Sequence, residues 1–191
     1  MSQLRMVFNA EKESLPEFTL PAGFRLRTVK KEELTAYSAL RLSAGFDEWQ
    51  ENTYHDYVAR ILQNGLLVIE DTASGRLAAS AGAEPAGREE LKQFGVLGWV
   101  MSHPDYRGKR LGYMVCAAVM HTLYQNGYRM YYLLTDDQRI PAIKTYLNLG
   151  WKPWLYEPDM EERWQKIAGE LGRSFESLGA LPEQITVPPK L

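Results

Sequence analysis

Apolar and polar positions follow regular spacings along most of the chain between residues 23 and 157. Residues 24–29 alternate apolar and basic side chains, which predicts a half-buried strand. Apolar side chains then recur every three or four residues in several segments that end near Gly or Asn-Gly, and this spacing predicts amphipathic helices. These segments are 31–44, 54–62, 111–123 and 141–149. Short apolar runs predict buried strands at 66–70, 77–83, 94–102, 130–135 and 151–156.

The order of these segments predicts a mixed α/β fold. From residue 94 onward the chain reads strand, helix, strand, helix, strand. Strands in one sheet that are joined by such helices must place the helices on the faces of the sheet. The sequence therefore predicts a layered domain with crossover helices.

The two ends of the chain lack this regularity. Residues 1–22 carry charges and two prolines without sustained periodicity, and we interpret them as a lead-in to a domain over 23–157. Within 158–191, residues 161–172 have helical spacing, and the last eighteen residues hold three prolines. The C-terminal part is therefore predicted to be a helix followed by a tail that docks on the domain or stays mobile. At 191 residues, the chain has the length of one domain.

Composition narrows the class of protein. Lysine and arginine number 22 against 24 acidic residues, and the formal charge of −2 argues against a nucleic-acid partner. The apolar runs are shorter than the ~20 residues of a membrane-spanning helix, and the first residues do not resemble a secretory signal. We therefore expect no membrane partner and a cytoplasmic protein. The single cysteine, Cys116, is expected to be a small buried residue.

Candidate chemistry is concentrated after the strand at 94–102. A turn beginning His103-Pro104 leads into a loop with three cations and a glycine at the start of a helix, where backbone N–H groups and the helix dipole favour an anion. The loop is not a Walker motif, because Arg110 follows Gly108-Lys109 where serine or threonine is required. A dinucleotide fingerprint is also missing from this segment.

Two segments together resemble the GNAT N-acetyltransferase superfamily. The first is the family pattern R/Q-x-x-G-x-G/A, matched by Arg107, Gly108, Lys109, Arg110, Leu111 and Gly112. The second is residues 133–151, which look like the family's later strand and the helix after it. Arg110 departs from the pattern, since the family usually has its middle glycine there. The resemblance implies an α/β fold (α+β by some schemes) with a mostly antiparallel sheet of six or seven strands and helices on both faces.

The resemblance also implies acetyl-CoA as cosubstrate. It implies that Val100, Met101 and Ser102 pair with the pantetheine arm and that the amides of residues 107–112 bind the pyrophosphate. Tyr146 falls where the family places its general acid. The strand at 94–99 has no carboxylate to serve as general base, so Glu84 is our candidate, with His55 and Asp56 as alternatives. Each of these could instead be a solvated polar residue.

The acceptor is predicted to be a small-molecule or peptide amine. Tyr54, His55 and Trp99 are our candidates to contact it, although aromatic residues are more often part of a core. The three histidines lack metal-ligand spacing, so no metal is predicted.

Three functional hypotheses follow. The first is an acetyl-CoA-dependent enzyme that acetylates a primary amine by direct transfer from the thioester. The second is a catalytically silent CoA-binding or regulatory module, motivated by Arg110 and by the missing strand carboxylate. The third is an interaction protein whose tail docks on a partner or on a sister subunit in a homodimer.

Overall fold

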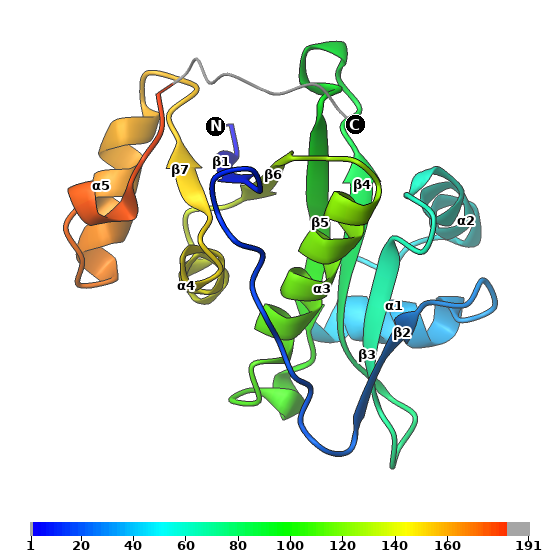
Figure 1. Cartoon of the computed structure of the whole chain (residues 1–191). Helices are drawn as coiled ribbons and strands as arrows, with labels where there is room; N and C mark the ends of the chain where they lie inside the picture. The colour runs from blue at the N-terminus through cyan, green and yellow to red at the C-terminus, as the bar shows by residue number, and fades with distance from the viewer. Residues whose placement is uncertain (1, 183–191) are drawn as a thin grey trace.

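A computed structural model describes residues 2–182 and contains one seven-stranded sheet in the order β2-β3-β4-β5-β6-β1-β7 (Figure 1). The strands are β1 (Leu4–Asn9), β2 (Phe24–Thr28), β3 (Leu66–Asp71), β4 (Leu77–Pro85), β5 (Phe94–Ser102), β6 (Met130–Thr135) and β7 (Lys152–Trp154). The helices are α1 (Leu34–Ser43), α2 (Glu51–Arg60), α3 (Leu111–Gln125), α4 (Ile140–Asn148) and α5 (Met160–Glu170). All neighbouring strands are antiparallel except β5 and β6, which are parallel. The predicted fold class is confirmed.

Helices cover both faces of the sheet. On one face α3 crosses the strands (Figure 1). Its apolar side, including Val115 and Val119, is fully buried. On the other face α1 and α2 bury Tyr37 and Tyr57 in a second core that also contains Val68 of β3. Burial of such large side chains is worth about 1.5–3 kcal/mol each, which makes the two cores the main source of stability.

The N-terminal segment is part of the sheet, and its interpretation as a lead-in is wrong for residues 4–9. Strand β1 lies between β6 and β7, with Met6 opposite Leu133 on one side and Pro153 on the other. The strand is buried on both faces, so its apolar residues form a run instead of an alternation, and Arg5 interrupts that run. Arg5 is accommodated because its guanidinium lies 3.8 Å from the centre of the Tyr156 ring.

The C-terminal helix also belongs to the core. Helix α5 confirms the helix predicted over 161–172, and its residues Trp164 and Ile167 are buried in the same core as α3. Leu181 then forms a parallel bridge with Trp154, so the described part of the tail docks along β7. The core thus extends beyond residues 23–157 at both ends. Residues 183–191 of the predicted tail lie outside the described residues.

Within residues 2–182, no helix is both long enough and apolar enough to cross a membrane.

Candidate active site

The site begins where β5 and β6 separate. Their parallel ladder pairs residues 94–96 with 130–132, and in the described chain it continues no further. Beyond this ladder, Trp99 and Val100 of β5 lie opposite the single residue Ala81 of β4. This two-to-one arrangement is a β-bulge. Trp99 has φ +48, so the bulge bends β5 away from a regular strand. The β5 edge facing β6 is therefore left with unpaired backbone groups over 97–102.

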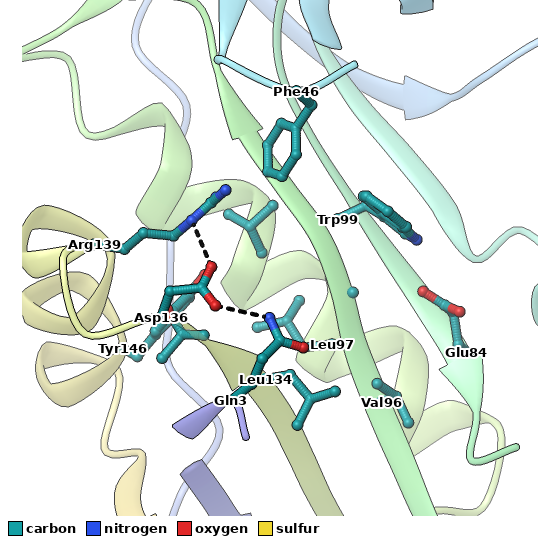
Figure 2. Close-up of a pocket in the computed structure, with 13 residues that line it drawn as sticks. Gln3, Phe46, Glu84, Val96, Leu97, Trp99, Leu134, Asp136, Arg139 and Tyr146 are labelled. Atoms are coloured by element: carbon teal, nitrogen blue, oxygen red, sulfur yellow. Dashed lines mark hydrogen bonds and ion pairs between the residues drawn. The ribbon is translucent and has the colours of Figure 1, made fainter. Parts of the chain in front are cut away.

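Three connected cavities follow this edge. We call the first the basic end; it has a volume of about 400 Å³ and is lined by residues of the α3 N-terminus and of α4. The second, the central groove, has about 700 Å³ and runs past Val100, Met101 and Ser102. The third, the inner chamber, has about 260 Å³ (Figure 2). Ser102 lines both the basic end and the central groove, and Tyr146 lines both the central groove and the inner chamber, so the cavities form one path.

The basic end gathers most of the predicted loop. Arg107, Gly108, Arg110, Leu111 and Gly112 all line it, and Gly112 is close-packed there. A Cβ added at Gly112 would lie 2.9 Å from the Ser102 hydroxyl oxygen, so a larger residue would require that hydroxyl to move.

Two side chains of this loop, those of Arg110 and Lys109, have positions that could not be predicted from the sequence. Arg110 has φ 58 and ψ 22, and its guanidinium carbon lies 4.6 Å from the centre of the Tyr113 ring. Lys109 lines none of the three cavities, and its ammonium is 5.6 Å from the centre of the Phe24 ring. The positive charge at the basic end therefore comes from Arg107, Arg110 and Lys144, the last of which lies on α4 and was not predicted.

Tyr146 lies at the junction of the central groove and the inner chamber. Helix α4 begins with Pro141 in its first turn, where the missing N–H costs nothing, and it buries Ile143 and Tyr146 on one side. Tyr146 is 5% exposed. Burial raises the pKa of its hydroxyl above the ordinary range, so the group stays protonated, and able to donate, at neutral pH.

Glu84 lies on the opposite wall of the inner chamber, near the end of β4 (Figure 2). The Tyr57 hydroxyl donates a hydrogen bond of 3.0 Å to its Oε1 atom. Burial raises the pKa of the Glu84 carboxyl, against the lowering effects of the Tyr57 hydrogen bond and of Arg60. Glu84 therefore combines access to the chamber with a carboxyl that takes up a proton more readily than an exposed one.

The other predicted polar candidates lie elsewhere. Tyr54 is fully buried and donates a 2.8 Å hydrogen bond to the Lys30 carbonyl oxygen, so its role is structural. His55 is half-exposed on α2, and its Nε2 atom lies 3.5 Å from Glu51 Oε1. Neither residue lines the three cavities, and neither does Asp56, so the structure does not bring these three candidates together with Glu84 and Tyr146. The helical spacing of α2 was interpreted correctly, but it does not tell which of its aromatic residues bonds to a residue of the chamber, and that residue is Tyr57.

Trp99, the third candidate for contact with the acceptor, lines the inner chamber. Its ring contacts Phe46 and Trp49 edge-on, with centroids 5.8 and 4.9 Å away. The guanidinium of the buried Arg41 lies 3.9 Å from the Trp49 ring centre and 4.5 Å from that of Trp99. This cluster fixes the loop between α1 and α2, which places Phe46 at the rim of the chamber.

The chamber also contains a polar group that sequence reasoning missed. Gln3 donates a 3.1 Å hydrogen bond to one Asp136 oxygen, and Arg139 Nε lies 3.2 Å from the other (Figure 2). The Arg139 guanidinium also stacks 4.4 Å from the centre of the Phe46 ring. Asp136 and Arg139 lie inside the second matched segment, which was their only signal. Gln3 gave none, because its position depends on the placement of β1.

The last groups to place are possible metal ligands and the thiol of Cys116. Among residues 2–182 no group of three or more His, Cys, Asp or Glu side chains is arranged to hold a metal ion. His103 accepts a hydrogen bond from the Asp105 N–H and caps the turn after β5. Cys116 is buried in the core, where burial raises the pKa of its thiol.

The sheet is thus opened between two parallel strands, beside a helix N-terminus that carries basic side chains. The sequence profile of the acetyltransferase (GNAT) family matches residues 26–151, and the chain belongs to this family. This confirms the resemblance noted in the sequence. A search of curated proteins found no match.

Solved structures of the family share the fold. A GCN5-related N-acetyltransferase from Sphaerobacter thermophilus has a TM-score of 0.62 at 16% identity, over 80% of this chain and 49% of that one. A tandem GNAT protein from the clavulanic acid pathway has a TM-score of 0.60 at 17% identity, over 80% and 50%. The ribosomal-protein-S18-alanine N-acetyltransferase from Escherichia coli has a TM-score of 0.55 at 20% identity, over 66% and 76%. The chain thus spans about half the length of the first two structures.

Proposed function

We propose that this protein transfers an acetyl group from acetyl-CoA to a primary amine of a compact small molecule or of a peptide end. The observation that carries the proposal is the continuous path from the basic end to the inner chamber, with Tyr146 at the junction. Family membership supports acyl transfer in general, and the name of the E. coli relative describes N-acetylation of an alanine. The small volume of the inner chamber, about 260 Å³, favours a compact acceptor group.

The described residues fit acetyl-CoA. Within residues 107–112, the N–H groups of Arg107 and Lys109 already donate to carbonyl oxygens of the preceding turn. The N–H groups of Gly108, Arg110, Leu111 and Gly112, together with the Arg107 and Arg110 side chains, suit a pyrophosphate. The unpaired edge of β5 can hydrogen-bond to the amide groups of the pantetheine arm, as a strand edge does with an added extended chain. The thioester would then reach the level of Val100, beside Tyr146.

The reaction is a direct attack. The neutral amine nitrogen forms a bond to the thioester carbon while the bond from that carbon to sulfur breaks. Glu84 accepts the proton that the amine loses, and Tyr146 donates a proton to the departing thiolate. The two residues lie on opposite walls of the inner chamber, which keeps the proton acceptor and the proton donor apart (Figure 2).

Calorimetry with acetyl-CoA, followed by a thiol-release assay over a panel of amines, tests the proposal. We expect binding, and turnover with at least one amine. Because a thiol with a pKa of about 8.5 is already a tolerable leaving group, Tyr146→Phe should lower kcat by about 10²-fold or less. Failure to bind acetyl-CoA, or binding without thiol release for any amine, would reject the proposed enzyme.

A catalytically silent CoA-binding module is the second candidate. It is favoured by Arg110 at the glycine position of the motif and by the absence of a carboxylate from β5. That module would bind acetyl-CoA, and its thiol release would be equal in the wild type and in Tyr146→Phe.

A further inference from the structure

We propose that Tyr57 is a positioning residue for Glu84, and that Gly82 and Gly98 form a notch that holds the hydrogen-bonded pair at the wall of the inner chamber. The inference deepens the proposed function, because it rests on Glu84 as the base that receives the amine proton. Tyr57 acts through Glu84 and lines none of the three cavities itself.

The two glycines lie directly opposite each other on β4 and β5. A Cβ added at Gly82 would lie 2.1 Å from the Tyr57 hydroxyl oxygen, and one added at Gly98 would lie 2.0 Å from Glu84 Oε1. Both distances are far below any van der Waals contact. Each glycine therefore makes room for one partner of the same hydrogen bond, and neither partner could keep its place beside an alanine.

The notch explains a feature of β5 that the sequence left open. Glycine inside a strand weakens it and indicates either a bulge or a close approach by another group. The bulge is at Trp99 and Val100, one residue further along, and the close approach at Gly98 is made by the Glu84 carboxylate. Gly95 has a different cause, since a Cβ there would lie 2.6 Å from Leu123 Cδ2 of α3.

The charged and titratable groups around Glu84 come from three elements. Tyr57 and Arg60 of α2 both favour its ionised form, while burial favours the protonated form. Tyr37 of α1 and Tyr132 of β6 are close enough for the Glu84 charge to raise the pKa of their hydroxyls. Removal of the Tyr57 hydroxyl leaves burial opposed by Arg60 alone, so the pKa of Glu84 should rise.

The first experiment measures that pKa without any acceptor. The full-length protein, labelled at the glutamate side-chain carboxyl carbons, is titrated by NMR, and the Glu84 signal is assigned with Glu84→Gln. We expect Tyr57→Phe to raise the pKa of Glu84 by about one unit, the size expected when a hydrogen bond to a charged group is lost. Tyr54→Phe is the matched control, because it removes a hydroxyl of the same helix that bonds to a backbone carbonyl outside the site.

The second experiment follows catalysis. A base works only when it is deprotonated, so kcat/KM rises with pH through the pKa of Glu84. The acidic limb of this profile should move to higher pH by about the same one unit in Tyr57→Phe and stay in place in Tyr54→Phe.

Gly98→Ala tests the notch itself. The added methyl must displace the Glu84 carboxylate, and we expect kcat/KM to fall toward that of Glu84→Gln, a loss of about 10²-fold or more. Gly169→Ala is the control, because a Cβ there meets nothing within 4 Å.

The outcomes separate the two proposals. If wild-type protein releases no thiol with any amine, the proposed function fails, and the role of Tyr57 in positioning a catalytic base fails with it. If the wild type is active but Tyr57→Phe changes neither the Glu84 pKa nor the acidic limb, only the positioning role is overturned. Full activity of Gly98→Ala would overturn the notch.

Discussion

Arg110 occupies a backbone conformation that glycine adopts more readily. Its φ of 58 and ψ of 22 lie in the left-handed region, where an L side chain costs about 1–2 kcal/mol. The arginine has compensating contacts, since its guanidinium stacks on Tyr113 and its charge faces the basic end of the groove. Arg110, which departs from the family motif, therefore costs backbone strain and in return adds a positive charge at the candidate anion site.

This trade predicts opposite effects of Arg110→Gly on stability and on binding. The free energy of unfolding should rise by up to about 1 kcal/mol, because relief of strain outweighs the extra unfolded-state entropy of glycine. Acetyl-CoA should bind about two- to five-fold more weakly, because one exposed cation is worth about 0.5–1 kcal/mol. Urea unfolding and calorimetry measure the two effects.

Lys109→Ala is the control for binding, because the Lys109 ammonium lies over Phe24 and outside the groove. Equal losses of affinity in the two variants would show that only the net charge of the loop matters. A less stable Arg110→Gly protein would contradict the strain argument.

At the scale of elements, the sequence predicted features that depend on residues close together in the chain. The family resemblance pointed to the α3 loop and to Tyr146, because the motif residues are close in sequence and keep a fixed order along a strand, a turn and a helix. Gln3, Lys144 and the Tyr57–Glu84 hydrogen bond were not predicted, because each depends on how segments far apart in the sequence pack in the fold. Strand β1 was missed for the same reason.

Strand β1 predicts a stability effect that a lead-in would not have. Met6 is fully buried between β6 and β7 and contributes to the main core. Met6→Ala should lower the free energy of unfolding by about 2–5 kcal/mol, as other large core truncations do. Urea unfolding measures this loss, with Gln3→Ala as an exposed comparison near the same end of the chain. A change within about 0.5 kcal/mol, typical of surface positions, would mean that β1 adds little to the core.

At the scale of the whole molecule, one arginine joins three distant segments. Arg163 of α5 donates to both oxygens of Asp137, at 3.0 and 2.6 Å, and to the carbonyl oxygen of Ser2 at 3.0 Å. It thereby ties the start of β1, the segment between β6 and α4, and the C-terminal helix together. Asp137 directly follows Asp136 of the inner chamber, so this tie also supports one wall of the candidate site.

The ion pair with Asp137 predicts a pH-dependent stability. Arg163 lowers the pKa of the Asp137 carboxyl in the folded protein, so the pair stabilises the fold above the unfolded pKa of about 3.9 and loses that effect as the pH falls through the folded value. Arg163→Met should therefore cost about 1–2 kcal/mol at pH 7, a figure reduced because Asp137 is partly exposed. The difference in the free energy of unfolding from wild type should shrink below about pH 4.

Lys166→Met, which removes an exposed pair with Glu162 on the same helix, should change the free energy of unfolding by less than about 0.5 kcal/mol. Urea unfolding at pH 7, 4 and 3 tests this, and an equal loss at all three values would show that Arg163 stabilises α5 by packing and not by charge.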